Sequence, residues 1–156
     1  MTMMEQIASD GRRVFHFRVL APGEGLDPPF GGEPYAALVW AACRTTDVQK
    51  ERPCTDLVES GCRYIVCGGA ASEVWEEVAD EVIVAQDRMD LDSPAEFVMT
   101  TSRTRETIDE AAYFLVRCTS FGHHDFTRYI VLLIGDDARV RETLIASIRA
   151  YAGAES

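Results

Sequence analysis

The sequence lacks most of the features that identify a functional class at sight. Its 156 residues contain no dinucleotide-binding glycine motif, P-loop lysine, zinc-protease motif, serine-hydrolase motif or EF-hand loop. They contain no internal repeat and no apolar run close to the roughly 18 residues that cross a bilayer. The N-terminal segment also lacks the apolar stretch of a signal peptide, so we expect a cytoplasmic protein that makes no membrane contact.

Basic residues are scarce as well. The chain has 15 Lys and Arg against 26 Asp and Glu, which gives a formal net charge of −11 at pH 7. A surface of this charge repels phosphate backbones and anionic lipids. Nucleic-acid binding is therefore disfavoured, and a partner attracted by charge should be basic.

The five cysteines are odd in number and include no CxxC pair. This excludes a complete disulfide framework and argues against a zinc knuckle. Cys62 and Cys67 bracket one apolar run and Cys43 follows another, so we expect all three to pack as small buried groups. No cofactor is indicated.

The sequence does contain a regular series of short apolar runs. Residues 14–20 alternate apolar and polar side chains, which predicts a strand at the edge of a sheet. Residues 21–34 hold four prolines and four glycines, which predicts a long surface connection. Runs that are apolar on both faces, as in strands covered on both sides, follow at 35–42, 62–67, 97–101 and 129–134.

Amphipathic stretches separate these runs. The pattern predicts helices over 72–83, with Ser72 as N-cap, and over about 107–117, after a capping box formed by Thr107 and Glu110. A C-terminal helix is predicted to begin at Asp136 or Asp137. An earlier helix ends before Gly61 and begins near Pro53 or, with a kink at that proline, near Asp47.

Strands that alternate with helices favour right-handed crossovers and a parallel sheet. We therefore predict one α/β domain over residues 1–156, a three-layer sandwich with a mainly parallel sheet of about five strands and helices on both faces. Residues 1–12 are predicted to be flexible, with the 14–20 strand at the edge.

The helix predicted over 72–83 has a uniformly acidic face. Its acids recur at i, i+3, i+4, i+7 and i+8, at Glu73, Glu76, Glu77, Asp80 and Glu81. Residues 73–96 hold nine acids and one base, so this segment carries −8 of the net charge of −11. Like charges at i, i+4 destabilise a helix slightly. The face is either a solvated surface that keeps the protein dissolved or a docking surface for a basic protein.

A second candidate site lies where the strands end. In a parallel sheet, ligands bind outside the carboxyl ends of the strands. Glycines, hydroxyls and a cation gather there at Gly68, Gly69, Thr100, Ser102 and Arg103. These residues suit an anionic ligand such as a nucleotide, but Thr and Ser also cap helices and Gly also allows a sharp turn.

The stretch CTSFGHHDFTRY, residues 118–129, places a possible nucleophile beside possible bases. Adjacent histidines in one loop cannot both face Cys118, and His123, His124 and Asp125 alone supply too few ligands for zinc. Histidines also suit the loop after a helix C-terminus. We interpret this stretch as a turn and assign no catalytic residue and no metal site to it.

Three short motifs resemble a family of small bacterial proteins whose domain has no known function. They are LVESGCRYIVCGG at 57–69, FVMTTS at 97–102 and YIVLLI at 129–134, the last preceded by a helix and a His-containing loop. The resemblance spans about residues 35–135 and implies a bacterial cytosolic α/β protein. Relatives carry Trp-Gly where this chain has Cys67 and Gly68, so the resemblance implies no nucleophile at Cys67.

The leading hypothesis is a non-enzymatic interaction protein whose acidic helix docks a basic partner, as an immunity or defence-system accessory protein would. The alternative is a domain, with or without enzymatic activity, that binds a small ligand or nucleotide at the carboxyl ends of the strands.

Overall fold

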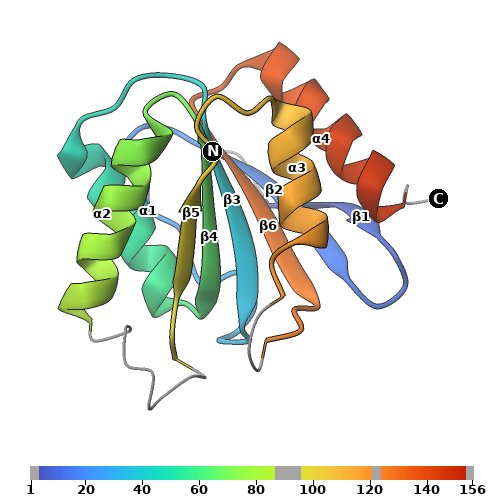
Figure 1. Ribbon diagram of the computed structural model, residues 1–156, viewed down its shortest axis with the longest axis horizontal. Helices are drawn as coiled ribbons and strands as arrows, with labels where there is room; N and C mark the ends of the chain where they lie inside the picture. Colours follow the sequence, from blue (N-terminus) through green and yellow to red (C-terminus); the bar gives the residue numbers. More distant parts are fainter. Residues whose placement is uncertain (1–3, 87–95, 121–123, 154–156) are drawn as a thin grey trace.

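The computed structural model describes residues 4–86, 96–120 and 124–153. It shows a six-stranded sheet between two layers of helices (Figure 1). The strands are β1 (Glu5–Ser9), β2 (Val14–Leu20), β3 (Tyr35–Ala41), β4 (Cys62–Gly69), β5 (Met99–Ser102) and β6 (Arg128–Ile134). The helices are α1 (Asp47–Glu59), α2 (Ser72–Ala85), α3 (Ile108–Arg117) and α4 (Ala138–Ala152).

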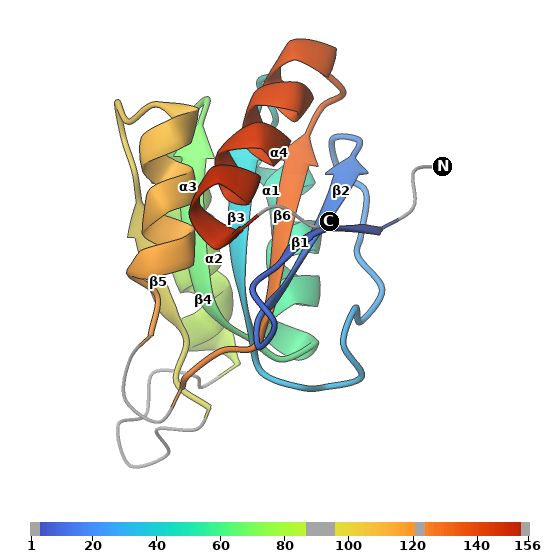
Figure 2. The same cartoon turned by 90° about the vertical axis from the view of Figure 1, so that its right-hand side faces the viewer.

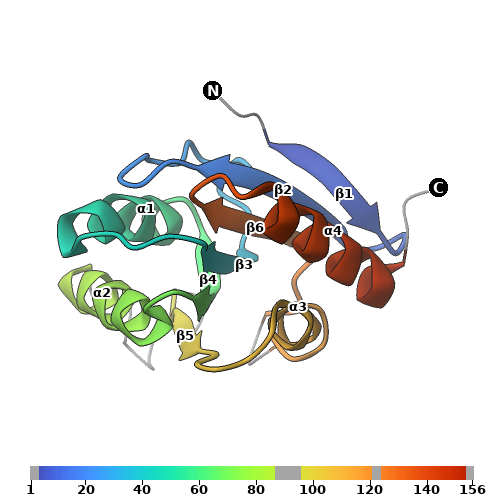
Figure 3. The same cartoon turned by 90° about the horizontal axis from the view of Figure 1, so that it is seen from above.

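The sheet has the order β1-β2-β6-β3-β4-β5, and every neighbouring pair is parallel except β1 with β2. Viewed from above, α1 and α2 cover one side of the sheet while α3 and α4 cover the other (Figure 3). The latter two helices lie side by side (Figure 2). The predicted three-layer sandwich is confirmed, with six strands in place of about five.

The central strands are almost entirely apolar because both of their faces are covered. Every residue of β3 is buried, and its side chains alternate between two cores. Leu38 and Trp40 pack on the side of α3 and α4, whereas Ala37 and Val39 pack on the side of α1 and α2. This double burial explains the unbroken apolar runs of the sequence.

The edge beside β2 differs from the prediction. Residues 5–9, within the segment predicted to be flexible, form β1, so the 14–20 strand is second from the edge. The register shifts between Gln6 and Ala8, which marks a bulge. Both Ile7 and Ala8 are buried as a result. Two adjacent inward residues break the period of two by which a strand is recognised in a sequence.

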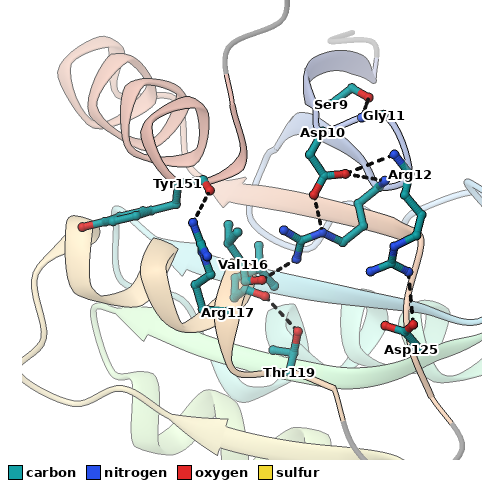
Figure 4. A network of polar contacts seen from close by, with 11 residues as sticks. Ser9, Asp10, Gly11, Arg12, Val116, Arg117, Thr119, Asp125 and Tyr151 are labelled. Atoms are coloured by element: carbon teal, nitrogen blue, oxygen red, sulfur yellow. Dashed lines mark hydrogen bonds and ion pairs between the residues drawn. The ribbon is translucent and has the colours of Figure 1, made fainter.

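A polar network joins the β1–β2 turn to the end of α3 and to the segment before β6, at the end of the sheet where β2 and β6 begin (Figure 4). The Asp10 carboxylate accepts hydrogen bonds from the backbone N of Arg13 at 2.7 Å and from its Nε at 2.7 Å. Burial raises the pKa of Asp10, but these bonds and the charge of Arg13 outweigh it and lower the pKa overall. Arg13 also donates to the carbonyl of Val116 at the end of α3, and Arg12 pairs with Asp125 at 3.2 Å.

The Pro/Gly-rich loop over 21–34 occupies the part of the α1 and α2 side that no helix covers. Leu26 is buried in the core on that side, and its backbone N donates to Asp56 Oδ2 of α1 at 2.8 Å. Phe30 packs edge-on against Tyr35, with ring centroids 5.0 Å apart. The loop is therefore packed against the fold over part of its length.

The start of one helix is decided between its two predicted alternatives, and the start of another needs correction. The first helix begins at Asp47, because Thr46 and Gln49 form a capping box, and Pro53 lies inside it. Ser72 is not an N-cap, because Ala71 takes that position with φ of 55° and no side-chain cap. The capping box of Thr107 with Glu110 is confirmed, as is Asp137 as an N-cap.

The run predicted as a doubly buried strand at 97–101 is also corrected. The strand observed there is β5, four half-buried residues at the edge of the sheet. Among the described strands only β4 pairs with it, so β5 is an edge strand there. Val98, just before it, is buried, which accounts for the apolar start of the run.

Replacing Ile7 with Ala should test the contribution of β1. Because Ile7 is 1% exposed, we expect the free energy of unfolding to fall by about 2–5 kcal/mol. Urea denaturation measures the change. The adjacent Gln6 is exposed, so Gln6→Ala should alter stability by less than about 0.5 kcal/mol. Equal stability of the two variants would contradict a packed β1.

Candidate functional site

The five acids of α2 divide into two groups. Glu73, Glu77 and Glu81 are exposed, whereas Glu76 and Asp80 are half-buried. The second pair packs against β5. There the Thr100 hydroxyl is the donor to both carboxylates, at 2.7 Å from Asp80 Oδ1 and 3.2 Å from Glu76 Oε2. Three of the five predicted residues thus face outward and two are held by the neighbouring strand.

The first helix extends this charge across the same layer. Its exposed acids are Asp47, Glu51 and Glu59, and its exposed base, Arg52, lies against Gly25 of the 21–34 loop. The acidic layer is defined here as the outward acids of both helices, Asp47, Glu51, Glu59, Glu73, Glu77 and Glu81. The rest of the acid-rich segment, residues 87–95, lies outside the described residues.

A shallow groove of about 180 Å³ runs between α1 and α2 within this layer. Glu51 and Glu81 stand at its edges. Its other lining residues are mostly apolar, Thr55, Val78, Val82 and Ala85. Val48, three residues before Glu51 on the same strip of α1, is 73% exposed. The groove therefore offers carboxylates on both sides of an apolar floor.

The two glycines predicted to approach a ligand instead allow close packing inside the sheet. A Cβ on Gly68 would lie 2.6 Å from the Trp40 ring, and one on Gly69 would lie 2.3 Å from the Ala41 carbonyl oxygen. The φ of Gly69 is +80°, which disfavours other residues. Both glycines are explained by the contact between β3 and β4.

The side chains of two of the remaining residues, Thr100 and Arg103, already have partners in the protein. The Thr100 hydroxyl donates to the carboxylates of Glu76 and Asp80 in α2. Ser102 pairs with Cys67 of β4 in the register of the sheet. Arg103 pairs with Glu106, and its guanidinium lies 4.0 Å from the centre of the Phe114 ring. Arg103 lines a cavity with Glu106 and Phe114, and none of the other four predicted residues lines that cavity.

Successive strands are added toward opposite edges of the sheet on either side of β3 and β6, and the crevice between these two parallel strands is filled. The backbone N of Ala42 donates to the Ile134 carbonyl at 2.9 Å. A Cβ on Gly135 would lie 2.7 Å from Cys43 Sγ, and the φ of +87° at this position disfavours other residues. In open α/β folds this crevice commonly holds the ligand, but here protein atoms occupy it.

A larger cavity of about 560 Å³ lies one strand further along the same edge, between the N-terminal ends of α1 and α2. We call it the Lys50 cavity. Its lining residues are Arg44, Thr45, Asp47, Lys50, Ala70, Ala71 and Val74. Sequence reasoning missed it, although one signal was present, because Lys50 is the only lysine among the 15 basic residues.

The cysteine and histidine side chains do not assemble a nucleophile and base. Cys118 is exposed at the C-cap of α3, whereas His124 is buried, stacks on Phe126 and lines a different cavity. His123 lies outside the described residues. Within the described ranges, no group of three or more metal-ligating side chains occurs.

The buried thiols are poorly suited to reaction. Burial raises the pKa of Cys54 and of Cys62 to about 12, and it also raises the pKa of Cys67 well above its usual value. Cys62 and Cys67 are fully buried, as expected, whereas Cys43 is only half-buried.

Together these features define a three-layer α/β protein with an acidic helix layer on one side and a cavity at the carboxyl edge of its sheet. The chain belongs to the family described as a domain of unknown function, DUF7684, whose model matches residues 15–150. The match is wider than the motifs that first indicated a family. No curated protein matches the chain. Among the helices of the described ranges, none has the length and apolar character required to cross a membrane.

Thiol titration should separate the cysteines by burial. With a disulfide reagent at about pH 8, Cys118 should react rapidly, Cys43 slowly, and the three buried thiols only upon unfolding, because the thiolate is the reactive form. Absorbance of the released thiolate gives the count, and Cys118→Ser should remove the fast phase. Rapid reaction of all five thiols in the native protein would contradict the packing.

Proposed function

We propose that this protein is a non-enzymatic interaction protein that binds a basic partner across its acidic layer. The partner class that fits is a basic toxin, nuclease or other component of a bacterial defence system, held by an immunity-like or accessory protein. Complementary charge of this kind accelerates encounter and selects among partners. The proposal rests on one observation, that the outward acids of α1 and α2 border an apolar groove.

The distribution of charge supports docking over simple solvation. The second helix has no Lys or Arg, and its outward strip continues from Glu77 and Glu81 to Val84, which is 66% exposed. The exposed face of α4, on the opposite side of the sheet, carries Arg139 and Arg149 beside Glu142. Exposed acids also occur on that side, at Asp109, Glu110 and Glu142, but exposed Arg117, Arg139 and Arg149 accompany them there.

The groove indicates the form of the partner's contacting segment. Carboxylates of Glu51 and Glu81 flank a floor that contains Val82 and Ala85. A cationic amphipathic segment would place Lys or Arg against the carboxylates and an apolar side chain against the floor. Exposed ion pairs contribute little affinity alone, so the apolar contact is the part that gives a stable complex.

Charge reversal within the acidic layer tests the proposal. Glu77→Lys/Glu81→Lys should remove a partner that the wild type captures from a native lysate at about 0.15 M salt. Both side chains are exposed, and neither accepts the Thr100 hydrogen bond, so the fold should remain intact. Mass spectrometry and circular dichroism measure capture and folding.

A matched control distinguishes the acidic layer from net charge. Glu5→Lys/Glu142→Lys changes the net charge by the same amount at exposed positions of β1 and α4, and it should retain the partner. A compensating acidic substitution in the purified partner should restore binding to the first variant. Capture of the partner by both variants alike, or by neither, would refute docking at this layer.

A further inference from the structure

We propose that the Lys50 cavity binds a phosphate-bearing small molecule, with Lys50 as the residue that pairs with the phosphate. This site lies at the end of the acidic layer proposed to bind a protein and shares only Asp47 with it, whereas Lys50 and Thr45 belong to the cavity alone. It lies outside the carboxyl ends of β3 and β4, on the edge where ligands of parallel α/β sheets are found.

The first observation is a buried cation without a counter-ion. Lys50 is 2% exposed, and its Nζ donates to the Thr45 carbonyl oxygen at 2.8 Å. Its other close neighbour is the Trp75 ring, whose centre lies 5.7 Å away. Among the residues the structure describes, no carboxylate lies within 4.0 Å of Nζ. Buried lysines are ordinarily paired with an anion, because an isolated buried charge is costly.

The second observation is a buried hydroxyl with no partner in the protein. Thr45 Oγ1 is inaccessible and makes no hydrogen bond within the described structure, and Thr45 lines the same cavity as Lys50. Buried hydroxyls are nearly always bonded, so this one indicates a group that the chain does not supply. An ammonium and a hydroxyl at one cavity are both able to donate to a phosphate oxygen.

The third observation concerns the helix starts at the cavity. The N-terminus of α1 is capped by Thr46, whereas α2 begins after Ala71 without any side-chain cap. Ala70 and Ala71 line the cavity, so the uncapped start of the 14-residue α2 adjoins it. Free backbone N–H groups and the helix dipole at such a start favour an anion.

The charge and size of the cavity narrow the ligand class. Arg44 and Asp47 are exposed lining residues of opposite charge, so the buried Lys50 sets the preference for an anion. A volume of about 560 Å³ exceeds what a phosphate group alone needs and falls in the range of small-molecule sites. A phosphorylated metabolite of nucleotide size fits both features.

Inorganic phosphate is the probe for the test, compared with chloride at equal ionic strength. We expect phosphate to raise the melting temperature of the wild-type protein and to shift the side-chain ammonium signal of Lys50 in the NMR spectrum. Because the chain has one lysine, that signal needs no further assignment. Adenosine monophosphate should produce both effects at lower concentration, since it fills more of the cavity.

Lys50→Met removes the charge and keeps the length of the side chain. We expect this variant to melt at or above the wild-type temperature without phosphate, because an unpaired buried cation is lost, and to show no phosphate effect. Thr45→Val should weaken phosphate binding about tenfold, the loss of one hydrogen bond to a charged group. Arg139→Met, which removes an exposed cation of α4, should bind phosphate as the wild type does.

Three results would overturn the proposal. One is a wild-type ammonium signal that phosphate and adenosine monophosphate leave unchanged. Another is an equal phosphate effect in wild type and Lys50→Met, which would place the anion elsewhere. The third is a folded Lys50→Met variant with lower stability and unchanged phosphate binding, which would make Lys50 a packing residue beside Trp75. None of these results bears on the acidic layer, whose test uses other residues.

Discussion

The insertion of β6 between β2 and β3 is the constraint on which the rest of the structure depends. Seven residues of β2 pair with β6, and β3 pairs with its other side, so β2 and β3 are consecutive in the chain but are not neighbours in the sheet. The centre of the sheet is completed by residues 128–134, after most of the chain. Long-range pairing of this kind is slow to form, because its loop entropy is lost before the contacts are gained.

This insertion decides what covers each face. The connection from β2 to β3 must return from one end of the sheet to the other and pass over β6, which requires about 20 Å of chain along the strands. The irregular 21–34 loop does this with Leu26 packed beneath it, so the α1 and α2 side has two helices and a loop. The acidic layer and the Lys50 cavity both belong to those two helices, one on their outer face and one at their N-terminal ends.

The sequence predicts what depends on local or periodic interactions. The central strands, the capping box of Thr107 and the outward spacing of the α2 acids belong to this group. It does not predict β1, because a bulge buries Ile7 and Ala8 together, and it leaves the start of α1 open between Asp47 and Pro53, because a proline also suits a first turn. The burial of Lys50 is harder still to predict, since it depends on Trp75 of α2 and on the loop that follows β4. The bond from Thr100 to Asp80 likewise joins residues 20 positions apart.

The single lysine has a consequence for how the protein is degraded. A protease that cleaves only after lysine has one site in the entire chain, the bond between Lys50 and Glu51, and that lysine is 2% exposed within α1. Cleavage there requires the helix to open at its N-terminal half. When opening and closing are fast, the rate of this single cut measures the free energy of that local opening. Proteolysis at this one bond would therefore report the local stability of α1. Global unfolding experiments do not resolve such a local opening of one helix.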